Sequence, residues 1–442
     1  MNGRRFEVKR RFDCDVLVVG GGTAGIAAAI AAARGGRRVI LVESRGFLGG
    51  NSVNIPAWLG FHACSGERLV GGIALELQRK LRAAGGATPF YRDPICGSLT
   101  GINTHLWKIA AFRETREAGV ESLLHTRFAG LEKQGRTIRR AFLFGGEGLL
   151  EVSCRFVIDC TDAGTVAREA GELLTRGRAT DGRVQASSWT FEVGNIDFGE
   201  LFAYFRRHPD DLRPFPLPDA AAHIDRIERE EAFVMGAFGS LIARSGMRLP
   251  RTNMPGIAFP RERRMVSVAV RVADVDPDDS PNYSRAEAEG ALQVPLWLEF
   301  LRREAPGFQN CVLSGSPDAI GVRETSHLAG EYVLTGADLM AGKTFDDAIA
   351  RGGYHLDIHS PDHGGLETRQ PPVFTIPFRS LLPRETDNLL VAGRALSATH
   401  EAQAAIRVIP IGMAIGEAAG TAAARAAKPE ELRAEPRCVP GI

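Results

Sequence analysis

The sequence predicts an α/β fold, in which a Rossmann-like domain with a parallel sheet and a β-meander receives an inserted α+β domain. Three observations lead to this prediction. A short apolar run ends in a glycine-rich turn and an alanine-rich helix, and a second apolar run ends in a glutamate. A strand-plus-helix pattern then returns near the C-terminal end, after a long segment of different character. The first two observations place a dinucleotide-binding unit at the start of the chain.

Length and charge exclude several classes of protein. The 442 residues are enough for two or three domains of about 100–200 residues each. The 54 basic and 53 acidic residues leave a net charge of +1, which argues against nucleic-acid binding driven by bulk charge. The seven cysteines include no C-x-x-C pair, so a zinc ribbon or a redox disulfide is not expected. Scattered cysteines fit a reducing compartment, and we expect a cytoplasmic location.

The N-terminal region resembles an export signal in one respect only. Arg10 and Arg11 precede the apolar stretch 16–33, as in a twin-arginine signal. Asp13 and Asp15 interrupt that pattern, and the apolar stretch carries the nucleotide-binding motif. We therefore expect this segment to be part of the fold, and we expect no membrane span elsewhere.

The first element is a strand that leads into a glycine motif. Residues 15–19, apolar and mostly β-branched after Asp15, are typical of a strand buried on both faces, and a helix over 24–34 follows. Between them Gly20, Gly22 and Gly25 form G-x-G-x-x-G. Gly20 allows the tight turn, Gly22 lets the backbone approach a pyrophosphate, and Gly25 lets the helix pack closely. Thr23 and Ala24 complete the predicted pyrophosphate site at the positive end of the helix.

The second strand ends in the acid that the motif requires. Residues 38–42 are an apolar run, and Glu43 follows eighteen residues after Gly25. A carboxylate there accepts hydrogen bonds from the ribose hydroxyls and repels a 2′-phosphate. Ser44 is included in this predicted ribose site. A chance glycine-rich turn is the weaker alternative, because strand, glycines, helix, strand and acid occur in the required order.

A second glycine pair, Gly49 and Gly50, follows the ribose acid and resembles the corresponding loop of the glutathione-reductase-type FAD fold. Further along, the chain resembles the FAD-dependent oxidoreductase family over most of its length. The segments that carry this resemblance are 46–51, 156–161, 320–325, 330–335, 388–394, 397–402 and 411–416.

The resemblance implies FAD as the cofactor and implies where it is bound. The loop after the ribose acid passes along the pyrophosphate and flavin, and the backbone near residue 128 faces the adenine. It assigns cofactor contacts to Gly49, Gly50, Asn51, Phe128, Thr161, Gly393, Arg394, Gly412 and Met413. The chain departs from the usual pattern at two positions. Asp162 stands where the family often has glycine, and Arg394 stands where many flavoproteins have aspartate.

The remaining patterns complete the predicted organisation. We expect helices over 70–83 and 104–117, a third parallel strand over 120–125, and a β-meander over 128–132, 138–144 and 149–158. A substrate domain over 176–384 is then predicted to interrupt the FAD-binding domain (1–175 and 385–426), with strands at 189–193 and 266–270, helices near 221–245 and 284–304, and a tail over 427–442. No second glycine fingerprint predicts a nicotinamide-binding domain.

The candidate catalytic residues cluster near the C-terminal helix. Pro410 suits the start of that helix, whose free N–H groups are implied to face the flavin. His400 and Glu401 precede it on a predicted loop, where His400 can serve as a general base. Arg407 can fix a substrate carboxylate or the flavin edge. The alternative is that all three only brace the loop.

Two further groups of residues are candidates for a catalytic or metal site. Arg323 is a catalytic candidate together with Glu324, and a buried ion pair at the domain interface is an equal alternative. His355, His359 and His363 are spaced by four residues, as metal ligands on a helix would be. The flanking glycines and proline favour a strand followed by a turn, in which that spacing is about 13 Å. We therefore expect no metal site.

These patterns predict an FAD-dependent oxidoreductase that transfers two electrons, as hydride, to or from a small organic substrate. The electron acceptor stays open between oxygen, a quinone and a carrier protein, and so do the substrate and any homo-oligomer. A flavin-dependent monooxygenase or halogenase is one alternative, although no W-x-W-x-I-P element occurs. A flavoprotein with structural FAD, acting as a binding module, is the other.

Overall fold

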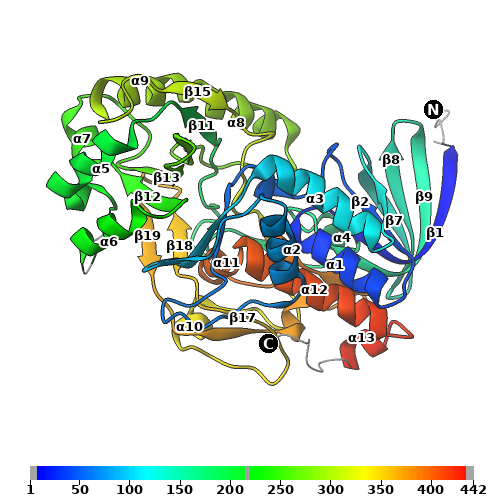
Figure 1. The fold of residues 1–442 in the computed structure, drawn as a ribbon. Helices are drawn as coiled ribbons and strands as arrows, with labels where there is room; N and C mark the ends of the chain where they lie inside the picture. The colour runs from blue at the N-terminus through cyan, green and yellow to red at the C-terminus, as the bar shows by residue number, and fades with distance from the viewer. Residues whose placement is uncertain (1–6, 215–216, 218, 435–442) are drawn as a thin grey trace.

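The computed structural model describes residues 7–214, 217 and 219–434 and consists of two lobes (Figure 1). The larger lobe contains a seven-stranded sheet in the order β6-β2-β1-β9-β8-β7, with β21 also paired to β9. The smaller lobe, at the upper left of Figure 1, contains a five-stranded antiparallel sheet in the order β12-β13-β14-β11-β15. We call the smaller lobe the cap.

The parallel part of the large sheet confirms the predicted Rossmann-like arrangement. β1 (Val8–Val19) pairs in parallel with β2 (Val39–Val42), and β2 pairs in parallel with β6 (Glu121–Leu123). On its other side β1 pairs with β9 (Gly148–Asp159), to which β21 (Leu389–Val391) adds in parallel. The apolar runs fit this arrangement because both faces of β1 and β2 are covered. β1 begins earlier than predicted and includes the paired arginines of the supposed export signal.

The β-meander is also confirmed. β7 (Arg127–Gln134) and β8 (Thr137–Gly145) pair antiparallel, and β8 pairs antiparallel with the first half of β9. β9 is long enough to serve both parts, since its second half pairs in parallel with the end of β1. The meander therefore returns the chain to the centre of the sheet, directly before the segment that contains Thr161.

Two helices of small residues pack against each other beside the sheet. α1 (Thr23–Arg34) and α12 (Ile409–Arg425) approach closely because α12 carries glycine at the contact. A Cβ at Gly416 would lie 2.0 Å from the carbonyl oxygen of Ala24, and one at Gly420 would lie 2.1 Å from that of Ala28. This packing brings the starts of the two helices to the same region, although they are almost 390 residues apart in the chain.

Two helices predicted for the cap differ from the structure. The segment 221–245 is not one helix but α6 (Ala220–Ile227), β12 (Phe233–Ala237) and α7 (Gly239–Arg244). The buried and half-buried residues of β12 alternate, as they do in a strand, and Gly236 within it disfavours a helix. The segment 284–304 forms two helices, α8 (Ser280–Leu292) and α9 (Val294–Glu304). A proline in the first turn of α9 explains the break.

The other elements are shorter and complete both lobes. The helices are α2 (Gly72–Ala83), α3 (Thr104–Glu117), α4 (Thr165–Glu169), α5 (Phe198–Arg207), α10 (Gly336–Met340), α11 (His400–Ile406) and α13 (Glu431–Ala434). The strands are β3 (Ala57–Leu59), β4 (Tyr91–Asp93), β5 (Gly97–Gly101), β10 (Leu174–Arg176), β11 (Phe191–Gly194), β13 (Met254–Phe259), β14 (Arg264–Ser267), β15 (Val312–Gly315), β16 (Ser326–Leu328), β17 (Ala348–Gly352), β18 (Leu356–His359), β19 (Leu366–Arg369) and β20 (Phe374–Pro377). The helix predicted over 104–117 matches α3.

The described residues form separate hydrophobic cores in the two lobes. The predicted domain boundaries at 176 and 384 stay a prediction. The cap has its own core, formed by residues between Phe191 and Val322. Apolar side chains between Leu334 and Leu382 instead share the core of α1 and α12. Within the predicted tail, Leu432 of α13 is fully buried in that same core. The part of the tail over 435–442 lies outside the described residues.

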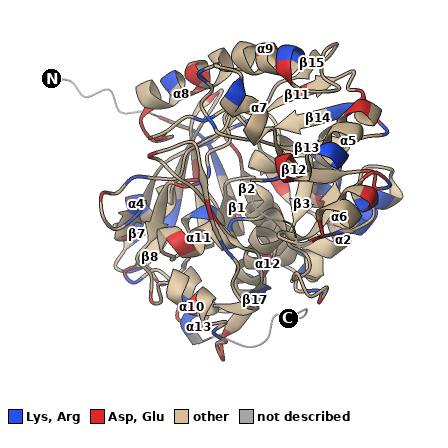
Figure 2. Ribbon diagram, turned by 90° about the vertical axis from the view of Figure 1, so that its left-hand side faces the viewer, with Lys and Arg blue, Asp and Glu red and all other residues tan. Residues whose placement is uncertain are grey.

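Surface charge and helix length agree with the composition. Figure 2 shows basic and acidic positions interspersed over both lobes, as the near-zero net charge implies. Within the described ranges, no single helix has the length and apolar character needed to cross a bilayer, and only α11 and α12 together, bent by 97°, pass that test.

Candidate functional site

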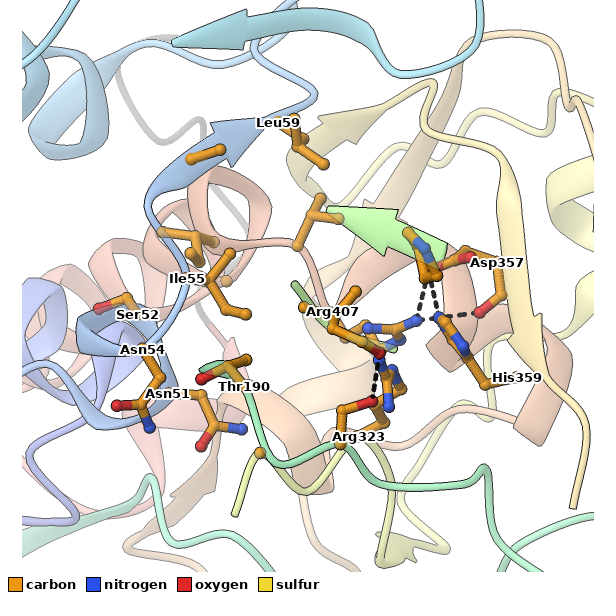
Figure 3. Close-up of a pocket in the computed structure, with 18 of the residues that line it drawn as sticks. Asn51, Ser52, Asn54, Ile55, Leu59, Thr190, Arg323, Asp357, His359 and Arg407 are labelled. Atoms are coloured by element: carbon orange, nitrogen blue, oxygen red, sulfur yellow. Dashed lines mark hydrogen bonds and ion pairs between the residues drawn. The ribbon is translucent and has the colours of Figure 1, made fainter. Parts of the chain in front are cut away.

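A cavity of about 340 Å³ is lined by residues of both lobes. Its walls come from the start of α1, the loop after β2, strands β12 and β13 of the cap, β18, and the start of α12. Figure 3 shows Asn51 and Asn54 on one side of it, with Asp357 and His359 on the other. The cavity therefore joins the glycine motif to the interior of the cap.

The glycine turn at one end is shaped as the motif predicts. Gly20 has a φ of 104°, in the left-handed region that favours glycine. A Cβ at Gly25 would lie 1.8 Å from the carbonyl oxygen of Gly20, so helix and strand are too close for any side chain there. A Cβ at Gly22 would instead meet nothing within 4 Å. Gly25 is thus needed for packing, whereas Gly22 borders open space in the cavity wall.

Two helix N-termini reach this cavity without a cap of their own. α1 begins after Gly22 and α12 after Val408, and neither has a side-chain cap or an acidic residue in its first turn. Gly22 and Gly412 both line the cavity. Free N–H groups and the positive ends of two helix dipoles therefore border the same space, which suits anionic or electron-rich groups of a ligand.

Glu43 lies where the motif requires it, at the carboxyl end of β2. Its carboxylate accepts hydrogen bonds from the backbone N–H groups of Gly21 and Arg45, at 2.8 Å each, and from the Ser44 hydroxyl at 3.1 Å. The carboxylate is thereby fixed beside the glycine turn. Glu43 and Ser44 are not in the lining of the cavity itself.

The second glycine pair lies alongside the first motif. Gly49 forms a parallel bridge with Gly22, and its N–H donates to the carbonyl of Gly21 at 2.8 Å. Gly49 has a φ of 113°, so the loop depends on glycine there. The side-chain amide of Asn51 donates to the carbonyl of Val322 at 2.9 Å and connects this loop to the end of the cap.

The two positions that depart from the family pattern contact each other. Arg394 forms an ion pair with Asp162 at 2.9 Å, and both line the cavity. Thr161, just before, is held by the buried carboxylate of Asp159, which accepts from its N–H at 2.9 Å and its hydroxyl at 2.6 Å. The two departures from the family pattern, Asp162 and Arg394, therefore form one ion pair.

The structure brings most, but not all, of the predicted site residues to the cavity. Those in its lining are Gly22, Thr23, Ala24, Gly49, Gly50, Asn51, Thr161, Arg323, Gly393, Arg394, Arg407 and Gly412. Those outside it are Gly20, Gly25, Glu43, Ser44, Phe128, His400, Glu401 and Met413. Phe128 lies on β7 and Met413 is fully buried in the core. The roles assigned to all of these residues stay predictions.

His400 belongs to a buried charge network away from the cavity. It is the first residue of α11, not part of a loop, and its Nδ1 lies 2.7 Å from Glu324 Oε2. His327 Nε2 lies 2.9 Å from Oε1 of the same carboxylate. Burial alone would raise the pKa of Glu324, but the bonds from His327 and His400 outweigh it and lower that pKa to about 2. Glu324 is paired with histidines, and not with Arg323 as the ion-pair alternative assumed.

The cap end of the cavity holds a group of arginines. Arg407 donates to Asp357 Oδ2 at 2.6 Å and to its carbonyl at 2.9 Å. Arg323 donates to the carbonyl of Ala186 at 2.6 Å. Burial, followed by the proximity of Arg407 and Arg251, lowers the pKa of Arg323 to about 9. These arginines therefore lie close enough to repel one another.

Two histidines flank Asp357: His359, the last residue of β18, and His355, the residue directly before β18. His359 Nε2 lies 3.3 Å from Asp357 Oδ2, and its Nδ1 lies 3.3 Å from a nitrogen of Arg251. His355 Nδ1 lies 3.2 Å from the carbonyl of Ile95, and its Nε2 lies 3.9 Å from Asp357 Oδ1. Burial lowers the pKa of both histidines, that of His359 to about 3. Both are therefore neutral near pH 7.

Sequence reasoning missed two of these lining residues, Asp357 and Arg251. Asp357 stands between His355 and His359, so an acid amid the spaced histidines was the available signal for this group. Arg251 had no such signal, because the side chain that it contacts, His359, is 108 residues away along the chain. The strand predicted for the histidine segment is confirmed by β18. Over the described residues, no group of three or more His, Cys, Asp or Glu side chains is arranged to hold a metal ion.

The donor set at the glycine end fits a dinucleotide. It combines open space at Gly22, two uncapped helix N-termini and a fixed carboxylate at the end of β2. These are the elements that bind a diphosphate and an unphosphorylated ribose.

The comparison with known families agrees with this geometry. The sequence model of the family described as FAD dependent oxidoreductase matches residues 15–435. No curated protein sequence matches significantly. Solved structures of similar fold include a geranylgeranyl bacteriochlorophyll reductase-like protein from Thermoplasma acidophilum (14% identity, TM-score 0.47, 96% of this chain and 80% of that one). p-Nitrophenol 4-monooxygenase PnpA from Pseudomonas putida DLL-E4 gives the same four values. The flavin-dependent brominase Bmp2 differs only in its 13% identity.

Proposed function

The chain belongs to the FAD-dependent oxidoreductase family and its cofactor is FAD, and on this premise we propose that it oxidises or reduces a small organic substrate by two-electron transfer. The observation that supports this proposal is one continuous cavity. It joins the glycine turn and two uncapped helix starts to a polar end lined by arginine and histidine. A cofactor end and a substrate end would therefore share a single cavity.

The residues of the glycine end would hold the cofactor. Backbone N–H groups at the start of α1, opened by Gly22, would bind the diphosphate, and Glu43 would accept from the ribose. The start of α12 would face developing negative charge on the flavin. When bound, FAD supplies a two-electron acceptor or donor. Arg394, held by Asp162, would contribute a cation at this end.

His355 is the proposed proton acceptor for the substrate. A carbonyl oxygen only accepts hydrogen bonds, so the contact with Ile95 fixes the proton on Nδ1 and leaves the lone pair on Nε2. Asp357, 3.9 Å from Nε2, would stabilise the imidazolium that forms on protonation. Because burial keeps His355 neutral near pH 7, it is in the form that takes up a proton.

His400 is then better suited to positioning than to proton transfer. Its ring is engaged by Glu324, and that contact outweighs burial and raises the pKa of His400 above its ordinary value. It begins α11, whose last turn leads directly into Arg407 and the start of α12. We therefore assign His400 the role of holding these cavity-lining residues in place.

The test is anaerobic bleaching of the flavin absorption band by a panel of candidate reductants. We expect FAD to be retained on purification or reconstitution, and at least one compound to bleach it. The His355→Gln variant should retain FAD and lose 10²–10⁴-fold in the rate of bleaching, the range for removal of a general base. As its matched control, His363→Gln changes an exposed histidine of the same segment and should leave the rate unchanged.

Three results would contradict the proposal. Protein that stays colourless with FAD would exclude the cofactor role of this cavity. Incorporation of an oxygen atom or a halogen into the substrate would favour the monooxygenase or halogenase alternative. A flavin that no compound in a broad panel bleaches would favour a structural FAD in a binding module.

A further inference from the structure

Charge is unbalanced at the cap end of the cavity. Five arginines line the cavity, at positions 213, 251, 323, 394 and 407. Three of them are paired with carboxylates: Arg213 with Asp93, Arg394 with Asp162, and Arg407 with Asp357. Among the described residues, no carboxylate forms an ion pair with Arg251 or Arg323.

Arg251 is buried, Arg323 is half-buried, and both are only partly bonded. Arg251 is 4% exposed, its Nε has no hydrogen-bond partner within the described chain, and one terminal nitrogen contacts the neutral ring of His359. Arg323 makes one bond, to the carbonyl of Ala186. A guanidinium has five N–H donors, so most of this hydrogen-bonding capacity is unused. Removing cations from water in this state costs free energy, and an anionic ligand would recover part of it.

The unpaired positive charge of Arg251 and Arg323 lies away from the groups that suit the diphosphate. The glycine turn, the starts of α1 and α12, and Arg394 serve the other end of the cavity. Arg251 contacts His359 of β18, and Arg323 lies close to both Arg251 and Arg407. The planar fork of a guanidinium matches the two oxygens of a carboxylate, and two forks on one site match it better than a single lysine would.

We infer that Arg251 and Arg323 bind a carboxylate group of the substrate, with Arg407 held beside them by Asp357. This inference rests on the proposed function and specifies its substrate class as a carboxylic acid. The uncompensated charge of two arginines makes a dicarboxylate the best match. Neither residue would take part in proton transfer, so both set affinity and orientation.

Calorimetric titration of the FAD-loaded protein with malonate tests this inference. Malonamide has a similar shape without charge and is the ligand control, and inorganic phosphate is the competing anion. We expect malonate to bind and malonamide not to bind. Arg251→Met and Arg323→Met should each weaken malonate binding at least tenfold. Arg303→Met changes an exposed arginine of α9 and should leave it unchanged.

Lysine variants keep the test decisive if a methionine variant does not fold. Arg251→Lys and Arg323→Lys retain the charge but lose the fork, and should still weaken binding measurably. No binding of malonate, equal binding in the variants, or tighter binding of phosphate than of malonate would overturn the inference. Bleaching of the flavin by an uncharged reductant, without malonate binding, would overturn this inference alone. Malonate binding by a protein that takes up no FAD would overturn only the proposed function.

Discussion

Arg323 and Glu324 are neighbours in the chain and illustrate two different uses of buried charge. Glu324 is fully buried and paired with two histidines, His327 and His400. Arg323 points to the cavity with one backbone contact and two other arginines near it. Successive side chains of an extended segment face opposite sides, so one turns to the core and the next to the cavity.

The two charges differ in the partners that the protein supplies to each of them. Both oxygens of the Glu324 carboxylate have histidine partners within the protein, outside the cavity, and in this sense the glutamate network is complete. The arginine group is incomplete within the described residues, and it lines a cavity. A complete buried network is expected to stabilise the fold, whereas an incomplete one is expected to lower stability and bind a ligand. The following predictions test this distinction, in order of expected effect.

Removing the carboxylate of the complete network should have the largest effect. In Glu324→Gln both histidines lose their anionic partner inside the core, and loss of one partner of a buried ion pair costs about 3–5 kcal/mol. We expect the free energy of unfolding, measured by urea denaturation, to fall by this amount. Glu299→Gln, which changes an exposed glutamate of α9, should alter it by less than about 0.5 kcal/mol. A loss under about 1 kcal/mol at position 324 would contradict the proposed stabilising role.

Replacing two arginines that line the same cavity should change the free energy of unfolding differently. Arg213→Met leaves the buried Asp93 without its cation and should lower the free energy of unfolding by about 3–5 kcal/mol. Arg323→Met leaves no carboxylate unpaired and removes a repulsive charge, so the free energy should stay constant or rise by about 1 kcal/mol. Parallel denaturation of the two variants measures the contrast. Equal losses would show that Arg323 is a structural residue.

The complete network should also give a defined pH dependence. The pKa of Glu324 is lowered to about 2, so its contribution to stability is present above its ordinary pKa of 4.5 and is lost as the pH falls toward 2. The pKa of His400 is raised above 6.5, so its contribution is complete below 6.5 and is lost as the pH rises through the raised value. The stability difference between the native protein and His400→Gln should therefore be larger at pH 5.5 than at pH 8.5. A difference that grows with pH would contradict the pairing.

The pair at the glycine end should show the smallest effect. The Asp162 side chain is 52% exposed, so solvent screens its contact with Arg394. A double-mutant cycle of Asp162→Ala and Arg394→Ala should give a coupling energy of at most about 1 kcal/mol in the unfolding free energy. A coupling above about 2 kcal/mol would show that this pair acts as a buried network.

Local patterns predicted the fold better than the site. The strand, glycine and helix around residue 22 and the strand at 389–391 were predicted because each is encoded by neighbouring residues. The segment 221–245 was predicted as one amphipathic helix, and pairing of its middle part with β13 makes that part a strand. The contacts of Arg251 depend on elements far apart in sequence, so no local pattern announces them.

The central claim is that an FAD-bound cavity receives a substrate through its carboxylate. The most direct test is anaerobic bleaching of the flavin by pairs of reductants, each acid compared with its methyl ester. We predict that at least one acid bleaches the flavin at a kcat/KM at least tenfold above that of its ester, and that Arg251→Met removes this preference. Esters that bleach as fast as their acids, in the native protein and in the variant alike, would contradict the claim.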